Sequence, residues 1–466
     1  MKKRIIPVAL ASALLFGAVG APAALAKPAE SASYKLPVKV SDHLVTKMIN
    51  VNNIYNTIAD LSKTPRVAGT ESEYKAVQYI KKKFESYGFK TEIQEFKYIG
   101  YTPPTNIELS VDGYDGTLAP KPFTFTVNGD VTGELVLAGK GKKDELQNAD
   151  LTGKIALIQR GEITFAEKVL NAAEKGASGV IIYNNADGDL NGTLGEANDK
   201  YVPAVGLTKA EGEALAAKVS ADAPVTAHLK VEGAVTGENT SHNVIATKKP
   251  TSKKKANNEI IVLGAHHDSV SGAPGANDDA SGTAMTLELS RVLKKLPTDT
   301  EIRFITFGAE EVGLVGSSHY VENLSEDEKS RIIANFNLDM VGSRDAGDLI
   351  LMTNDGQPNL VTELAQASST RLNGAPTPYA QGGRSDHVPF AEAGIPAALF
   401  IHNPSEPWYH TPDDSLDKIS KEKLQDVAEI VGAAIYDRAR IDVQWPKVKH
   451  GKKYKTPHLY HEQDIK

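Results

Sequence analysis

Residues 259–282 read EIIVLGAHHDSVSGAPGANDDASG, an apolar run that gives way to a polar loop of small residues. The run at 259–265 has the length and the branched apolar content of a buried strand. Helical spacing follows at 280–296, and His266 and Asp278 lie in the connection between strand and helix. In open α/β sheets ligands bind beyond the carboxyl ends of the strands, so this connection is a candidate site.

The alternation of strands and helices continues through the region at about 238–442. Strands are predicted at 243–247, 259–265, 301–307, 332–338, 348–353 and 397–401, and helices at 280–296, 359–372 and 420–438. This alternation favours an α/β fold with a mixed, mostly parallel sheet flanked by helices on both faces.

The N-terminal part of the chain contributes further elements. Apolar spacing is helical at 44–87, with a break at 64–66, and residues 90–98 alternate as a strand does. Residues 27–43 are small, polar and unpatterned, so we predict a flexible start to the mature chain.

A stretch with a different composition and pattern separates these two parts. Between about 103 and 237 the chain has short strands and turns rich in Gly, Asp and Thr. Buried strands are predicted at 153–161 and 180–183, and an amphipathic helix lies between them at 165–176. The predicted boundaries are 44–102 and 238–442 for a discontinuous main domain, 103–237 for a small inserted α/β domain and 443–466 for a polar basic tail.

Residues 1–26 have the organisation of a signal peptide. Three basic residues at 2–4 precede an apolar run, and Ala-Leu-Ala at 24–26 supplies the pattern of a signal peptidase site. A membrane anchor is the alternative, but the apolar stretch is too short and is interrupted by proline. We therefore expect a secreted (extracellular) protein whose mature chain has no membrane span.

The composition limits the chemistry that is open to the chain. It has 466 residues, of which 41% are hydrophobic and 24% charged, and it has no cysteine. Disulfides and thiol catalysis are therefore excluded, and a metal must be held by oxygen and nitrogen ligands. Removal of the signal peptide takes three of the 52 basic residues and leaves 49 against 59 acidic ones, a net charge of −10. Such a protein has no broad attraction for nucleic acid or an anionic membrane, and neither is expected as a partner.

Candidate site residues follow the ends of the predicted strands. His266 and Asp268 are two residues apart, so Asp268 can accept the second N–H of a metal-binding His266. A solvated His-His-Asp loop is the alternative. Asp278 lies twelve residues beyond His266, where a carboxylate can bridge two metals or, more simply, cap the following helix.

Two adjacent glutamates follow the next predicted strand. Glu310 and Glu311 come after the run at 301–307, and adjacent residues on extended backbone point in opposite directions. One of them can bind a metal while the other faces the open site as a base. The alternative is that the two glutamates are only charged residues where the strand passes into a loop.

An aspartate and a histidine complete the pattern. Asp339 ends the run at 332–338, where a buried acid needs a partner. His410 follows Tyr409, an aromatic pair that packing alone also explains. Together with His266, Asp278 and one of the two glutamates, these residues supply about the number of protein ligands that two zinc ions need.

Other catalytic motifs are missing from the sequence, which has no HExxH, no GxSxG and no phosphate-binding glycine loop. Ser385, Asp386 and His387 are the residue types of a catalytic triad. Neighbours in sequence cannot adopt the geometry of a triad, so we interpret this string as structural or as support for the site.

The sequence resembles the co-catalytic di-zinc aminopeptidases with a phosphorylase/hydrolase-like α/β fold, most nearly the secreted Bacillus enzymes that act on leucyl, arginyl and related N-termini. The resemblance covers most of 44–440. Its motifs occur in the order of the family: AHHDS, GANDDASG, FGAEEVGLVGS, NFNLDMVG, SDHVPF and PWYHTPDDS. Residues from about 103 to 237 are similar to the protease-associated (PA) domain that many members carry, chiefly through GKIALIQRGEITFAEKVLNAAEKGASGVIIYNN.

The resemblance implies a role for each candidate. Two zinc ions per subunit are implied, one held by His266 and Asp339, the other by Glu311 and His410, with Asp278 bridging. Glu310 matches the general base, Asp268 the acid behind His266, and Tyr409 a tyrosine that helps polarise the scissile carbonyl in some members. Arg384 lies where some members have an arginine near the substrate.

The implied function is the removal of N-terminal leucine, arginine, lysine or other residues from peptides with a free N-terminus. Two alternatives stay open. A carboxypeptidase or dipeptidase on this scaffold needs a basic pocket, to which Arg384 could contribute. A non-catalytic peptide-binding protein is the other, although such members lack ligands that this sequence retains.

Overall fold

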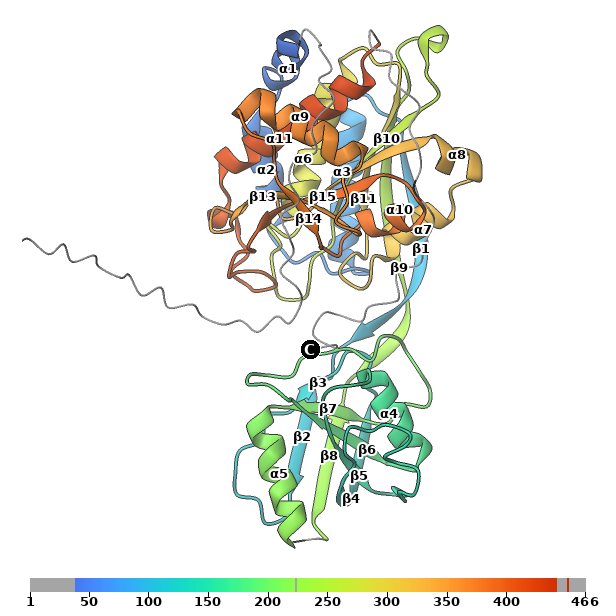
Figure 1. Cartoon of the computed structure of the whole chain (residues 1–466), viewed down its shortest axis with the longest axis vertical. Helices are drawn as coiled ribbons and strands as arrows, with labels where there is room; N and C mark the ends of the chain where they lie inside the picture. Colours follow the sequence, from blue (N-terminus) through green and yellow to red (C-terminus); the bar gives the residue numbers. More distant parts are fainter. Residues whose placement is uncertain (1–37, 223, 442–450, 452–466) are drawn as a thin grey trace, which may run out of the picture.

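The structure is a computed structural model that describes residues 38–222, 224–441 and 451. The predicted signal peptide at 1–26 lies outside the described residues, as does the predicted tail at 443–466 apart from residue 451. The described chain forms two lobes joined by a long pair of strands, as Figure 1 shows.

The larger lobe is built on an eight-stranded sheet in the order β1-β9-β11-β10-β12-β15-β13-β14. Its strands are β1 (Thr91–Thr102), β9 (Val235–Lys248), β10 (Ile260–His266), β11 (Glu301–Phe307), β12 (Ile332–Leu338), β13 (Asp348–Thr353), β14 (Tyr379–Gln381) and β15 (Ala397–Asn403). Strands β11, β10, β12 and β15 are parallel, whereas β9 and β13 run antiparallel to their neighbours β11 and β15. The predicted α/β class with a mixed, mostly parallel sheet is confirmed.

Helices cover both faces of this sheet because alternate residues of each buried strand are apolar. Ile261 and Leu263 of β10 pack in one core cluster, and Ile260 and Val262 pack in another on the opposite face. The first face carries α1 (Val38–Thr46), α2 (Val51–Leu61), α3 (Glu71–Ser86), α6 (Ala280–Lys294), α9 (Leu360–Asn373) and α11 (Lys421–Ala439). The second carries α7 (Val315–Glu322) and α10 (His387–Glu392), and α8 (Glu326–Arg331) precedes β12.

Helix α1 overlaps the stretch at 27–43 that the sequence predicts to be flexible, and that prediction is wrong from residue 38 onward. Val45 is fully buried, and the Asp42 carboxylate accepts two hydrogen bonds from Arg371 of α9, at 2.7 and 2.9 Å. A partner 329 positions away leaves no local pattern, so the sequence did not indicate this helix.

The smaller lobe is built on a seven-stranded sheet in the order β2-β8-β4-β5-β6-β7-β3. Its elements are β2 (Asn106–Val111), β3 (Lys121–Pro122), β4 (Gly129–Leu137), β5 (Ile155–Gln159), α4 (Phe165–Glu174), β6 (Gly179–Tyr183), β7 (Ala204–Leu207), α5 (Lys209–Asp222) and β8 (Thr226–Glu232). The two helices bury opposite faces: Val169 of α4 packs with Ile158, and Leu215 of α5 packs with Leu157.

Strands β1 and β9 carry the chain between the lobes. They pair antiparallel from Thr91 opposite Ala246 to Thr102 opposite Val235. The chain thus leaves the larger lobe and returns to it on neighbouring strands, which Figure 1 shows as the ribbon between the lobes.

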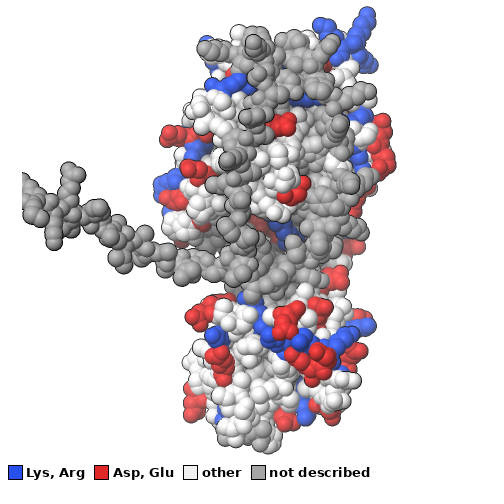
Figure 2. Space-filling model, in the orientation of Figure 1, with Lys and Arg blue, Asp and Glu red and all other residues white. Residues whose placement is uncertain are grey.

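Acidic and basic side chains are interspersed on the face of the smaller lobe seen in Figure 2. Several of them pair, among them Lys142 with Glu162 at 2.8 Å and Lys143 with Glu174 at 3.6 Å. Within the described residues, no helix combines the length and apolar character needed to cross a membrane.

Candidate metal centre

The carboxyl ends of four parallel strands meet at one edge of the larger sheet. His266 is the last residue of β10, and Asp339 directly follows β12. Glu310 and Glu311 lie in the turn after β11, and His410 lies in the loop after β15. Since β11, β10, β12 and β15 are neighbours in that order, the topology brings these predicted residues to one place.

Asp278 lies between the two histidines. Its Oδ1 is 3.1 Å from Nε2 of His266, and its Oδ2 is 3.1 Å from Nε2 of His410. Nε2 of His410 is also 3.1 Å from Oε2 of Glu311, and Nε2 of His266 is 3.6 Å from Oδ1 of Asp339. The five side chains therefore form two imidazole–carboxylate groups that share one carboxylate.

The neighbouring Asp279, rather than Asp278, caps the helix α6. Its Oδ1 accepts the N–H of Gly282 at 2.8 Å, and its Oδ2 accepts the N–H of His266 at 3.3 Å. Oδ1 also accepts the N–H of Met340 at 3.3 Å, so Asp279 joins the ends of β10 and β12 to the start of the helix. The sequence left two roles open at this position, a helix cap and a bridge between metals. Asp279 is the cap, so the Asp278 carboxylate is left to face the site.

Asp268 links the end of β10 to the turn that carries the glutamates. It is fully buried, and its Oδ1 lies 3.5 Å from Nδ1 of His266. The same carboxylate accepts the backbone N–H groups of Glu310 and Glu311 at 3.1 and 3.2 Å. One acid therefore lies beside an imidazole nitrogen and also fixes the backbone of both glutamates.

The crowding of acids shifts the proton affinities of the site. Burial, followed by the charges of Glu311, Asp386 and Asp339, raises the pKa of Glu310 well above its usual value, although His266 opposes the shift. Burial and the charge of Asp278 raise the pKa of Glu311 to about 7. A buried cluster of like charges needs a cation to keep its carboxylates ionised.

The pKa values of the two imidazoles are raised as well. Burial disfavours the charged form of His266, yet Glu310 and the adjacent carboxylates raise its pKa well above the usual value. Burial likewise opposes ionisation of His410, but Asp278 and Glu311 raise its pKa to about 10. Each ring thus lies where the surrounding acids favour positive charge.

Tyr409 and Arg384 lie at the rim of the cluster. Tyr409 is 46% exposed, and its ring stacks on His410 with centroids 3.7 Å apart. Burial and the nearby carboxylates raise the pKa of its phenol, so the hydroxyl keeps its proton and can donate. Arg384 is exposed, and its Nη2 is 3.9 Å from the position that a Cβ would take on Gly313, in the turn after Glu311.

Ser385, Asp386 and His387 do not assemble into a triad. All three are buried, and Ser385 accepts a hydrogen bond from Nδ2 of Asn337 at 2.8 Å. Among the residues that the structure describes, neither ring nitrogen of His387 has a hydrogen-bond partner, and burial lowers its pKa to about 3. His387 is therefore a neutral core residue.

Several residues that support the site were not predicted. Arg66 is almost fully buried and donates to the backbone carbonyls of His267, Pro274 and Gly275 at 2.7, 2.6 and 2.8 Å. Asp414 accepts the backbone N–H groups of Asn277 and Asp278 at 2.8 and 3.0 Å. The only sequence signals were the break at 64–66 and the acidic end of PWYHTPDDS.

The donor set fits zinc. Ligand atoms of His266, Asp278 and Glu311 lie within 4.8 Å of one another, as do those of His266, Asp279 and Asp339. Within the described part of the chain, buried oxygens of Glu311 (Oε1) and Asp339 (Oδ1) have no hydrogen-bond partner. A mixture of imidazole and carboxylate donors suits zinc, whereas calcium and magnesium favour oxygen ligands.

Comparison with known proteins identifies the family. A model described as peptidase family M28 matches residues 243–435, and a PA domain model matches residues 131–215. The chain is 40% identical to aminopeptidase YwaD of Bacillus subtilis (strain 168), an alignment that covers 100% of both chains. It belongs to peptidase family M28.

Solved structures agree with this assignment. An aminopeptidase from Aneurinibacillus sp. strain AM-1 is 57% identical, with a TM-score of 0.81 over 90% of this chain and 99% of that one. A zinc aminopeptidase from Bacillus subtilis is 41% identical, with a TM-score of 0.69 over 86% and 98% of the two chains. The predicted resemblance to aminopeptidases with an inserted PA domain is confirmed, and so is the predicted enzyme class.

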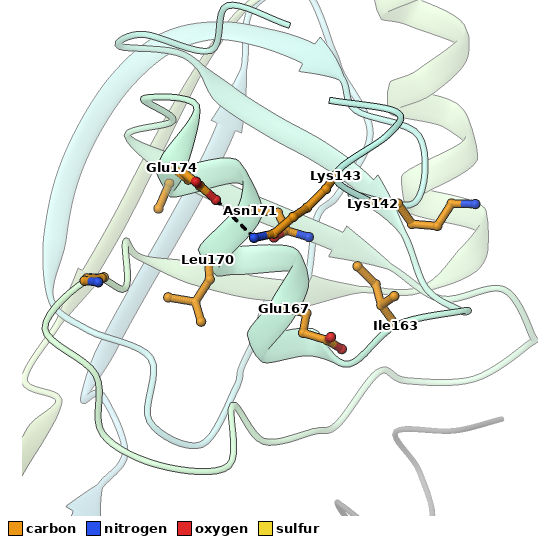
Figure 3. A pocket seen from close by; sticks show the side chains of 9 residues that line it. Lys142, Lys143, Ile163, Glu167, Leu170, Asn171 and Glu174 are labelled. Atoms are coloured by element: carbon orange, nitrogen blue, oxygen red, sulfur yellow. Dashed lines mark ion pairs between the residues drawn. The ribbon is translucent and has the colours of Figure 1, made fainter. Parts of the chain in front are cut away.

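A cavity of about 850 Å³ lies apart from the ligand cluster, against helix α4 of the smaller lobe. Figure 3 shows Leu170 and Ile163 on its wall and Lys143 reaching toward Glu174. Its charged lining residues are of both signs, and Lys143 pairs with Glu174, so its walls select no single charge.

Proposed function

We propose that the chain is a secreted aminopeptidase that uses two zinc ions to remove residues from the free N-terminus of peptides. One observation carries the proposal: the two oxygens of Asp278 face two imidazoles, one from the end of β10 and one from the loop after β15, each at 3.1 Å. A shared carboxylate between two such groups is suited to a site for two metals. His266 and Asp339 would hold one ion, Glu311 and His410 the other, and Asp278 both.

Zinc, when bound, supplies Lewis acidity that makes water a nucleophile near neutral pH and polarises a carbonyl. The remaining chemistry belongs to the protein. Glu310, whose pKa is raised by burial, accepts the proton of the attacking water and passes it to the nitrogen of the leaving amine. The Tyr409 hydroxyl donates a hydrogen bond to the oxygen on which negative charge develops.

Selection of a free N-terminus requires acids that receive an α-ammonium group. Glu310 and Asp339 lie in the same cluster and are the candidates for this contact. An ammonium group placed there gains from the same excess of negative charge that raises the pKa of both histidines.

A set of matched peptides tests the function. We expect rapid loss of the first residue from a peptide with a free N-terminus and no cleavage of its N-acetylated form, while amidation of the C-terminus has no effect. Cleavage that requires a free C-terminus would instead identify a carboxypeptidase. Binding of the peptides without turnover, in the zinc-loaded protein, would identify the non-catalytic alternative.

Secretion rests on the N-terminal sequence alone. The basic start at 2–4, the apolar run and the Ala-Leu-Ala at 24–26 support cleavage before Lys27. N-terminal sequencing of the protein recovered from culture medium should find Lys27 first. An intact N-terminus on protein retained by the cells would contradict it.

A further inference from the structure

Residues 404–415, here called the His410 loop, connect β15 to the 3-10 turn at Leu416–Lys418. The loop presents His410 to the site, and 35% of the His410 side chain is exposed, whereas Glu406 and Asp414 of the same loop are buried. The backbone of His410 has φ +58°, a left-handed conformation that a residue with a Cβ keeps only where its surroundings hold it. Contacts elsewhere in the loop must therefore fix the position of this ligand.

Buried anchors hold the loop, and two of them converge on Asn277. Nδ2 of Asn277 donates to Oε1 of Glu406 at 2.7 Å, and its backbone N–H donates to Oδ1 of Asp414 at 2.8 Å. The second oxygen of Asp414 accepts the N–H of Asp278 at 3.0 Å. A further anchor lies at the rim, where Nε1 of Trp408 donates to Asp345 at 2.9 Å.

Asn277 is also bound to the other ligand-bearing segments. It is fully buried, and its Oδ1 accepts the N–H of Gly342, in the segment that follows Asp339, at 2.8 Å. Its backbone carbonyl accepts the hydroxyl of Ser281 at 2.7 Å, at the start of α6. One amide side chain therefore spans the segments that carry Asp339 and His410, and its backbone precedes Asp278.

We infer that Asn277 is a positioning residue, and that its hydrogen bond to Glu406 sets the His410 loop against Asp278 and so assembles the Glu311/His410 half of the centre. This inference rests on the proposed function, because it assumes two zinc ions. The Asn277 amide donates a hydrogen bond to Glu406 of the loop and accepts one from the N–H of Gly342. An aspartate at this position has the same shape and still accepts from Gly342, but its second oxygen is an acceptor that faces the acceptor of Glu406.

A donor–acceptor swap tests the inference. N277D should weaken the binding of one zinc equivalent by about 10-fold or more and leave the other close to wild type, since changes to groups behind metal ligands cost about 10–100-fold. E406Q alone should bind both equivalents nearly as wild type does, because an amide oxygen can still accept. The double variant N277D/E406Q restores a donor facing an acceptor and should recover the lost affinity.

Zinc binding is measured on the full-length apoprotein by competition with a chromophoric chelator, at pH 8 and without substrate. The control N258D adds the same charge on an exposed residue before β10 and should bind two equivalents as wild type does. H410A identifies the equivalent that belongs to the Glu311/His410 half. Should N277D fail to fold, as judged by near-UV circular dichroism, E406L removes the same bond and should weaken that same equivalent.

The outcomes separate the inference from the proposed function. Failure of the wild-type protein to bind two zinc equivalents contradicts the proposed function. If wild type binds two and N277D, or E406L in its place, also binds two with unchanged affinity, Asn277 does not position the loop. Loss in N277D without recovery in the double variant also overturns the inference, because the defect then lies in general packing rather than in this hydrogen bond.

Discussion

Asp268 accepts the backbone N–H of Glu310 at 3.1 Å, so an acid at the end of β10 holds the proposed base at the end of β11. The same carboxylate lies 3.5 Å from Nδ1 of His266. We expect D268N to lose about 10–100-fold in kcat/KM, because an amide NH2 would face an N–H donor of the turn.

The D268N defect should appear in zinc affinity as well as in turnover, measured by chelator competition and by steady-state kinetics. The exposed Asp413 provides the matched control D413N, which should behave as wild type. Unchanged kinetics in D268N would remove Asp268 from the site.

Glu310 is expected to act on protons and to leave metal binding intact. E310Q should retain both zinc equivalents and lose at least about 100-fold in kcat, as is typical when a general base is removed. Stopped assays of a leucyl p-nitroanilide, together with the metal content of the purified variant, measure both quantities. E322Q, on the exposed end of α7, is the control. Near-normal turnover in E310Q would assign the base to another residue.

Removal of metal should abolish activity reversibly. A cluster of carboxylates and imidazoles without its cations lacks the Lewis acid that the reaction needs. We expect dialysis against a strong chelator to reduce activity to background and two equivalents of zinc to restore it. Thermal unfolding of the larger lobe should also shift upward on zinc addition, since the ions bind the folded state. Full activity after exhaustive chelation would exclude a metal mechanism.

Arg384 is expected to affect substrate binding more than chemistry. Its guanidinium lies beside the turn at Gly313, at the rim and exposed. R384A should raise KM for peptides by several-fold with kcat within about 2-fold, the pattern of a lost contact that is equal in ground and transition states. Comparison of dipeptide and p-nitroanilide substrates shows whether the contact involves the peptide's carboxyl side. A large fall in kcat with constant KM would contradict this role.

Acid should destabilise the metal-free protein through His387. Burial lowers the pKa of this side chain from 6.5 to about 3, so below pH 6.5 the unfolded chain binds a proton that the folded chain does not. Stability is therefore lost as the pH falls from 6.5 toward 3, by about 2 kcal/mol at pH 5 from this residue. H387L removes the effect, and the Tm of its apoprotein should depend less steeply on pH than that of wild type. The exposed His43 supplies the control H43L, which should keep the wild-type slope.

Much of the fold was predictable because its central strands are short, continuous apolar runs. The bounds predicted for β11, β12 and β13 agree with the structure residue by residue. Helices α8 and α10, of six residues each, were not predicted. Tertiary contacts such as the burial of Phe390 stabilise α10 more than its own sequence does, whereas α8 starts with a capping box of Ser325 and Glu328.

The candidate site was also predictable only in part. Strand ends predicted the candidate residues, and the resemblance to the family divided them into five proposed ligands and a base; the structure brings the five ligand candidates together. The residues that orient them could not be named, because their partners are far away in sequence: Asn277 and Glu406 are 129 positions apart, and Asn277 and Gly342 are 65 apart. The strand and helix pattern alone left Asp278 with two roles, bridge or helix cap, and the hydrogen bonds of Asp279 show that Asp279 is the cap.

The pairing of Thr102 with Val235 has a consequence for how the smaller lobe is attached. The chain enters and leaves that lobe at two positions that are about 5 Å apart, the spacing of neighbouring strands. The lobe is therefore an insertion at the tip of a hairpin, and a change in its length or internal structure leaves the register of β1 and β9 in the larger sheet unaltered.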